Sequence, residues 1–256
     1  MKTTDSPEHR TFRIENQLYI VKIVLKAFYK IYSGILHFLG RHYYSRNSDK
    51  RTLTYDWNSV PYNRIALVNK IVSLYENPSY LEIGCAGDVL FKSVNAPNKI
   101  GVDPAAGGTN RMTSDQFFET NSQHFDVVFI DGLHTYNQVW KDVENSLKFL
   151  KRDGFIVLHD MIPNNWMEQH CPIITSGVWT GDVWKLSFDL VNLRGADYFL
   201  VSVDHGIGVL RKREGQVQLL PQSLDEATKY SHFLDNINNL PIVDWNTAMQ
   251  HIVRNG

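Results

Sequence analysis

Acidic and imidazole side chains stand at the ends of the chain's short apolar segments, which are residues 80–83, 99–102, 125–130 and 155–158. The side chains that could do chemistry there are Glu82, Asp103, Asp131, His134, His159 and Asp160. Carboxylates and imidazoles accept hydrogen bonds from hydroxyl groups, bind cations and move protons. If the segments are parallel strands, their carboxyl ends meet at one edge of a sheet, where open α/β sheets bind ligands. The pattern therefore predicts one cleft that combines ligand binding with acid–base chemistry.

The glycine turn after the first segment indicates the kind of ligand. It reads Glu82-Ile83-Gly84-Cys85-Ala86-Gly87. A dinucleotide fingerprint starting at Gly84 needs glycines at positions 86 and 89, which are alanine and valine here, so no pyrophosphate cradle is expected. Asp103, at the end of the next segment, has two oxygens that can accept both hydroxyls of a ribose. The order of these residues favours a nucleoside cofactor over a purely structural turn.

The segments between these ends predict the fold. Residues 65–75 and 139–150 carry apolar side chains at helical spacing, and they alternate with the short apolar strands. Fully apolar strands separated by helices are typical of a parallel sheet buried on both faces. Residues 198–203 and 207–210 flank Asp204-His205-Gly206, which predicts an antiparallel hairpin. We expect a Rossmann-like α/β fold with a mostly parallel, seven-stranded sheet, a C-terminal antiparallel hairpin and helices on both faces.

These motifs resemble the class I S-adenosylmethionine-dependent methyltransferases. The resemblance covers about residues 60–212 and rests on YLEIGCAGDVL, IGVDP and FDVVFIDGLHTYNQVWKDVENSLKFLKRDGFIVLHDM, and it is most similar to the branch with sugar and antibiotic-tailoring O-methyltransferases. It implies that Glu82, Gly84 and Gly87 shape the methionine pocket, that Asp103 binds the ribose, and that Ser114 and Asp115 approach the adenine. It also implies that Asp131 faces the methionine end. The remaining expected cofactor contacts are Cys85, Pro104 and Gly132.

Methyl transfer from a sulfonium to a hydroxyl needs an aligned acceptor and often a base. We expect His134 or His159 to be that base, with Asp160 orienting it or binding a metal. Some relatives bind a divalent ion through the acid after the third strand and an Asp-Asp pair after the fourth. Here the pair is His159-Asp160, so Asp131, His159 and Asp160 are the candidate ligands for Mg²⁺ or Mn²⁺.

The insert between the fourth and fifth strands is expected to form part of the acceptor pocket. Asp182 and Lys185 are its candidate substrate-binding residues, with an exposed helix cap and a solvated lysine as the alternative. Trp166, Trp179 and Trp184 could stack on a sugar face or fill the core. His205, in the hairpin turn, is expected to be structural or exposed.

Composition and charge limit the partners. The net charge of −1 excludes a strongly cationic nucleic-acid binder, and two cysteines in 256 residues favour a reducing, cytoplasmic compartment. No cleavable signal peptide is expected from the polar first seventeen residues. We expect a helical segment at residues 1–50, the methyltransferase domain at 51–215 and a helical extension at 216–256.

The N-terminal segment is basic and amphipathic. Residues 9–46 hold seven Lys or Arg against one acid, with apolar side chains at helical spacing. Such a helix can cover its own domain, pair two copies through residues 12–40, or lie peripherally on an anionic membrane.

Three functions compete. The first is O-methylation of a sugar or glycan hydroxyl, and the second is methylation of a small aromatic or lipid-like metabolite. The third is a non-catalytic cofactor-fold protein that docks a partner through its N-terminal helix.

Overall fold

The computed structural model describes residues 25, 30–213, 217–225 and 227–253. The chain divides into two compact units: Met1–Asn47 with Ile174–Gly177, and Ser48–Ile173 with Val178–Gly256. In the smaller unit residues 30–45 form a helix, and Gly40 lies so close to Ile174 that a Cβ would meet its Cγ2 at 2.9 Å. Most of the predicted contact segment 12–40 lies outside the described residues. Within the described ranges, no helix is both long and apolar enough to cross a bilayer.

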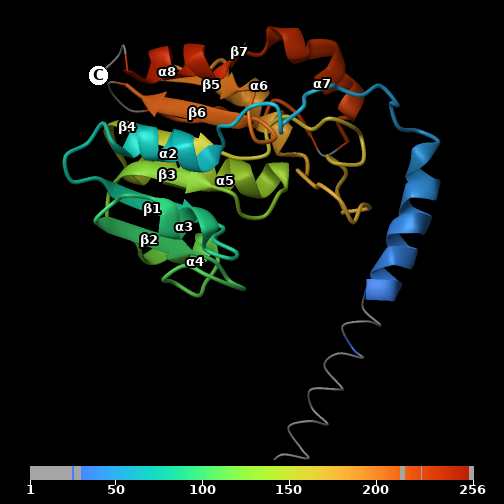
Figure 1. Cartoon of the computed structure of the whole chain (residues 1–256), viewed down its shortest axis with the longest axis horizontal. Coiled ribbons are helices and arrows are strands. Elements are labelled where there is room, and N and C mark those ends of the chain that lie inside the picture. The colour runs from blue at the N-terminus through green and yellow to red at the C-terminus, as the bar shows by residue number, and fades with distance from the viewer. Residues whose placement is uncertain (1–24, 26–29, 214–216, 226, 254–256) are drawn as a thin grey trace, which may run out of the picture. The chain divides into compact units, whose positions relative to one another are not determined.

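The larger unit is built on a seven-stranded sheet, as predicted (Figure 1). Its strand order is β2-β1-β3-β4-β6-β5-β7, and only β6 runs antiparallel to its neighbours. The strands are β1 (Ser79–Ile83), β2 (Asn98–Val102), β3 (Phe125–Ile130), β4 (Leu150–Leu158), β5 (Ala196–Val201), β6 (Ile207–Lys212) and β7 (Ile242–Val243). The antiparallel β5–β6 hairpin confirms the expected C-terminal feature.

Helices cover both faces of this sheet. The main core cluster joins Tyr80 of β1 and alternate residues of β3, β4, β5 and β6 to three helices, α2 (Arg64–Val72), α3 (Val89–Ser93) and α8 (Trp245–Val253). In β3, Val127 and Phe129 belong to this cluster, so the equally buried Val128 and Ile130 point to the opposite face. The helices of the remaining chain are α4 (Ser114–Thr120), α5 (Tyr136–Phe149), α6 (Leu186–Leu190) and α7 (Tyr230–Asn236).

The register of the strands sets where the candidate residues lie. Ile83 pairs with Val102 on one side and with Ile130 on the other, and Ile130 pairs with Leu158. The four strands therefore end at the same level, and the residues that follow them share one edge of the sheet. Because Leu158 pairs with Gly208, the tight turn before β6 lies at this edge too.

Candidate functional site

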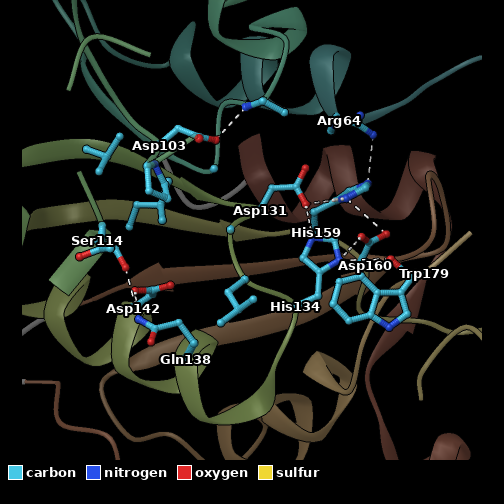
Figure 2. Close-up of a pocket in the computed structure, with 18 of the residues that line it drawn as sticks. Arg64, Asp103, Ser114, Asp131, His134, Gln138, Asp142, His159, Asp160 and Trp179 are labelled. Carbon is cyan, nitrogen blue, oxygen red and sulfur yellow. Dashed lines mark hydrogen bonds and ion pairs between the residues drawn. The ribbon is translucent and has the colours of Figure 1, made fainter. Parts of the chain in front are cut away.

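A cavity of about 850 Å³ opens at the carboxyl edge of the sheet (Figure 2). Its size falls within the range usual for small-molecule and cofactor sites. The predicted residues on its wall are Gly84, Asp103, Pro104, Ser114, Asp115, Asp131, Gly132, His134, His159 and Asp160. The predicted residues outside it are Glu82, Cys85, Gly87, Asp182 and Lys185. Asp103, Asp131, His134, His159 and Asp160 thus share one cleft, as the spacing predicts, whereas Glu82 does not line it.

Gly84 makes the turn after β1 possible. Its φ is +85°, and a Cβ there would lie 2.1 Å from the backbone oxygen of Asp131 and 2.7 Å from Gly132 Cα. The loops after β1 and β3 therefore approach so closely that only glycine fits between them. A Cβ on Gly87 would meet nothing within 4 Å, and its φ is not in the left-handed region. Of the two glycines in the motif, only Gly84 occupies a position where the backbone conformation and the close neighbours exclude a side chain.

Asp103 ties the turns after β1 and β2 together. One carboxylate oxygen accepts from the backbone N–H groups of Cys85 and Ala86 at 3.0 and 2.9 Å, and the other from Ala105 and Ala106 at 2.7 and 2.8 Å. Burial alone would raise the pKa of Asp103, but these four bonds outweigh it and lower the pKa. Four bonds fill the usual acceptor sites of a carboxylate. Its expected role toward the ribose stays a prediction.

Glu82 is buried behind the cavity wall. It is 1% exposed, and it accepts a 2.5 Å hydrogen bond from the Tyr80 hydroxyl. Burial raises the pKa of Glu82 to about 7, against the opposing effect of the Tyr80 bond. Glu82 does not line the cavity, and its expected role in shaping the methionine pocket stays a prediction.

At one side of the cavity, polar groups from α4 and α5 converge. Thr113 caps α4, which places Ser114 and Asp115 in the first turn of that helix at the cavity wall. From α5, the Gln138 amide nitrogen lies within hydrogen-bond distance of three oxygens, Ser114 Oγ, Asp115 Oδ1 and Asp142 Oδ1, at 3.3, 3.1 and 3.0 Å. Neither Gln138 nor Asp142 was expected from the sequence. The spacing of apolar residues in α5 indicates which face of the helix is buried, but it does not indicate that this face borders a cavity.

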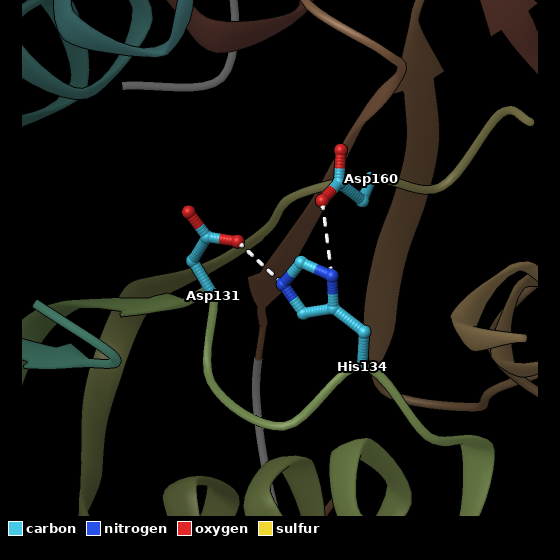
Figure 3. A group of neighbouring side chains, drawn as sticks. All are labelled: Asp131, His134 and Asp160. Atoms are coloured by element: carbon cyan, nitrogen blue, oxygen red, sulfur yellow. Dashed lines mark hydrogen bonds and ion pairs between the residues drawn. The ribbon is translucent and has the colours of Figure 1, made fainter. Parts of the chain in front are cut away.

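Two carboxylates hold His134 from opposite sides of its ring (Figure 3). Its Nε2 lies 3.1 Å from Asp131 Oδ1, and its Nδ1 lies 3.3 Å from Asp160 Oδ2 and 3.2 Å from the carbonyl oxygen of Trp179. Burial would lower the pKa of His134, but the bond to Asp131 and the charge of Asp160 raise it. The indole of Trp179 stacks on the imidazole, with ring centroids 5.3 Å apart.

His159 lies deeper and has more partners. Its Nδ1 is 3.2 Å from Asp131 Oδ1 and 3.3 Å from Asp160 Oδ1, and the nearby carboxylates raise the pKa of His159 although burial opposes this. Its Nε2 lies 3.1 Å from Arg64 Nη1. Arg64 also binds both oxygens of Asp204 at 3.0 Å. Because β6 returns beside β4, the hairpin turn brings Asp204 and His205 to the cavity wall. The expectation that His205 is structural or exposed stays a prediction.

The same acidic residues offer a group that fits a divalent cation. One ligand atom each from Asp131, His134 and Asp160 lie within 4.8 Å of one another. Two carboxylates and an imidazole suit Mg²⁺ or Mn²⁺. The predicted set contained His159 in place of His134; in the structure both imidazoles contact Asp131 and Asp160.

Asp182 and Lys185 belong to the interior of the insert. Lys185 is 2% exposed and binds Asp182 Oδ2 at 2.9 Å and the Asp225 carbonyl at 3.0 Å. Asp182 Oδ1 accepts from the N–H of Tyr136 at the start of α5. The alternative of an exposed cap and a solvated lysine is thus wrong, because the two residues form a buried ion pair. Neither residue lines the cavity, so their expected contact with the substrate stays a prediction. Trp166 and Trp184 are buried as well, so Trp179 is the one tryptophan of the three on the cavity wall.

Comparison with known proteins gives one family match. Residues 101–161 match the family model described as a methyltransferase domain. This segment contains Asp103, Ser114, Asp131, His134 and Asp160, so it spans most of the cavity wall. No curated protein matches the chain.

Solved structures show a weaker similarity. An O-methyltransferase from Bacillus cereus in complex with SAH has a TM-score of 0.45 and 11% identity, covering 63% of this chain and 84% of that chain. The SAH-bound methyltransferase PaMTH1 from Podospora anserina has a TM-score of 0.45 and 13% identity, and the match covers 68% of this chain and 93% of that chain.

The matched segment runs through β3 and β4, so the match to a methyltransferase domain and most of the wall of the strand-end cavity fall on the same part of the chain.

Proposed function

We propose that the protein methylates a hydroxyl oxygen and that His134 removes the hydroxyl proton. The observation that carries the proposal is the position of His134 on the cavity wall, clamped between Asp131 and Asp160. Its side chain is 19% exposed, whereas that of His159 is 6% exposed, so His134 is the more accessible base.

The contacts of His134 indicate which nitrogen takes the proton. The Trp179 carbonyl can only accept a hydrogen bond, so Nδ1 carries a proton in both charge states of the ring. Nε2 is then the atom that gains the proton of the acceptor, and Asp131 stabilises the imidazolium that forms. His159 and Arg64 hold Asp131 and Asp204 in place from the other side of the cluster. S-adenosylmethionine supplies an activated methyl group when it is bound in the cavity.

Gly84, Gly132 and Pro104 would contact this cofactor, with Ser114 and Asp115 at its adenine. The close approach of the loops at Gly84 fits a ligand pressed against the turn. A divalent ion held by Asp131, Asp160 and one histidine would lower the pKa of the acceptor hydroxyl. If His134 is that histidine, it cannot also be the base, so dependence on the ion separates the two mechanisms.

The acceptor is proposed to be a sugar or glycan hydroxyl, supported by the aromatic face of Trp179 beside His134. A small aromatic or lipid-like acceptor is the second candidate, because the exposed apolar side chains of Leu133 and Val178 also line the cavity. Methyl-transfer assays with sugars and with apolar phenols, each with magnesium and with a chelator, test both candidates. We expect S-adenosylhomocysteine (SAH) to form only when a hydroxyl acceptor is present. If no hydroxyl acceptor gives SAH, O-methylation is contradicted.

A further inference from the structure

The helix at residues 30–45, drawn in blue in Figure 1, is apolar along one side. At 3.6 residues per turn, seven of its large apolar side chains fall within an arc of about 160° around the helix axis. This apolar arc consists of Ile31, Tyr32, Ile35, Leu36, Phe38, Leu39 and Tyr43, with His42 as its one polar member. The other helix residues are Lys30, Ser33, Gly34, His37, Gly40, Arg41, Tyr44 and Ser45.

The apolar arc is exposed, whereas the opposite side of the helix is the more covered one. All seven apolar residues of the arc are between 48% and 74% exposed. Within the same compact unit, Ile174 packs at Gly40, which lies outside the arc. The helix residues that are partly covered are Ser33, His37, Gly40, Arg41 and Ser45. An amphipathic helix that is held by its own chain covers its apolar side, so the exposed arc of this helix is available to another surface.

The charge of the segment indicates which surface fits. No Asp or Glu occurs from residue 16 to residue 48, and the same stretch holds five Lys or Arg. In the helix, Lys30 and Arg41 lie about 20° apart, on the side opposite the apolar arc. The helix thus combines an apolar side with a purely basic polar side, which is the pattern of helices that lie on anionic lipid.

A second copy of the helix fits less well than a lipid surface. Paired helices are usually joined along a narrow apolar seam and matched by opposite charges beside it. An arc of about 160° is wider than such a seam, and two copies offer each other no carboxylate for Lys30 or Arg41. The width of the arc and the single sign of charge therefore both favour an extended anionic surface.

We propose that the helix at residues 30–45 docks the protein on an anionic membrane surface, with its axis parallel to the bilayer plane. The apolar arc enters the boundary between headgroups and acyl chains, and Lys30 and Arg41 stay on the side of the headgroups and water. Tyr32 and Tyr43 suit this boundary, because tyrosine joins an apolar ring to a polar hydroxyl. The inference is independent of the proposed function, since it uses no residue of the cavity.

Flotation of the full chain with lipid vesicles tests the inference. The protein should bind vesicles of phosphatidylcholine with about 30% phosphatidylserine about tenfold or more tightly than vesicles of phosphatidylcholine alone. Raising the salt to about 0.5 M should remove most of this difference, because salt screens the attraction between the basic side chains and the lipid.

A charge-neutral variant tests the apolar arc separately. Ile35→Gln combined with Leu39→Gln removes two side chains from the middle of the arc, so binding to the anionic vesicles should fall by about tenfold or more. Leu220→Gln combined with Val253→Gln is the matched control, because these two apolar residues are 62% and 48% exposed but belong to the larger unit. Its vesicle binding should equal that of the unaltered protein. All four replaced residues are exposed, so thermal unfolding should show both variants folded.

Each other outcome overturns the inference. Equal binding to the two kinds of vesicle would exclude recognition of anionic lipid, and unchanged binding in the Ile35 and Leu39 variant would exclude the apolar arc. Sedimentation velocity without vesicles completes the test. A dimer that this variant dissociates, together with no flotation, would assign the arc to a second copy. A monomer that does not float would show that the protein does not dock on lipid.

Discussion

The Nε2 atom of His134 lies 3.1 Å from Oδ1 of Asp131, three residues earlier in the chain. The strand β3 ends just before Asp131, and the loop folds back so that the imidazole faces the carboxylate that begins the loop. Asp160, which follows β4, closes the other side of the ring. The adjacent ends of two parallel strands thus fix the orientation of one histidine at the cavity wall.

Replacement of His134 should separate catalysis from cofactor binding. His134→Ala removes the proposed base, so kcat should fall by about 10²- to 10⁴-fold. The affinity for S-adenosylhomocysteine should stay within about threefold, because Gly84 and Ser114 remain in place. His124→Ala, at an exposed histidine outside the cavity, is the matched control and should keep full activity. Unchanged kcat in His134→Ala would remove this residue from the mechanism.

The two glycines of the turn should respond differently to the same substitution. Gly84→Ala forces a Cβ to within 2.1 Å of the Asp131 backbone oxygen, so the loops after β1 and β3 must separate and cofactor binding should be lost. Gly87→Ala meets no atom within 4 Å and should bind the cofactor normally. Titration of both variants with S-adenosylhomocysteine measures the difference. Equal affinities would show that the close approach at Gly84 does not shape the site.

The buried Glu82 should make stability depend on pH. Its pKa in the folded protein is about 7, above the ordinary value of 4.5, so the folded state holds this proton more tightly than the unfolded state does. The resulting stabilisation is complete below about pH 4.5 and is lost as the pH rises through 7, with a total on the order of 3 kcal/mol.

Glu82→Gln should abolish this dependence, so the variant should gain stability relative to the unaltered protein between pH 5 and pH 8. Urea unfolding across that range measures it, with the exposed Glu119→Gln as the control. Parallel pH profiles for the Glu82 variant and the unaltered protein would refute a buried, proton-retaining carboxyl at this position.

Lys185 should contribute to stability more than to acceptor binding. Lys185→Met leaves Asp182 buried without its cation, which costs roughly 3–5 kcal/mol in comparable buried pairs. Lys148→Met breaks the exposed pair with Glu144 and should cost at most about 1 kcal/mol. Denaturant unfolding gives both values. A large rise in the acceptor KM of Lys185→Met without loss of stability would instead restore the substrate-binding prediction.

The arrangement of the strands that carry the site could be predicted, because it follows from the spacing of apolar residues along the sequence. Short apolar strands alternating with helices predict a parallel sheet, and parallel strands bring Asp103, Asp131 and His159 to one edge. The prediction that these residues share a cavity therefore did not depend on any side-chain contact. The hairpin at Asp204-His205-Gly206 was also predicted from its turn residues.

The other parts of the site could not be predicted, because they depend on contacts between segments that are far apart in the sequence. Arg64 and Asp204 are 140 residues apart, and no periodicity indicates that they meet beside His159. Ser223 and Glu226 have the spacing of a capping box, which predicts a helix from residue 223. In the structure the Ser223 N–H donates to Asp189 Oδ1, 34 positions earlier in the chain, and α7 begins at Tyr230.

Calorimetric titration with S-adenosylhomocysteine, with NAD as the comparison, tests the central claim most directly. The described cavity, with its glycine turn and without a pyrophosphate cradle, predicts binding of about one S-adenosylhomocysteine per chain and no measurable binding of NAD. Tight binding of NAD, or no heat from S-adenosylhomocysteine, would contradict the assignment of this cavity to a methyl donor.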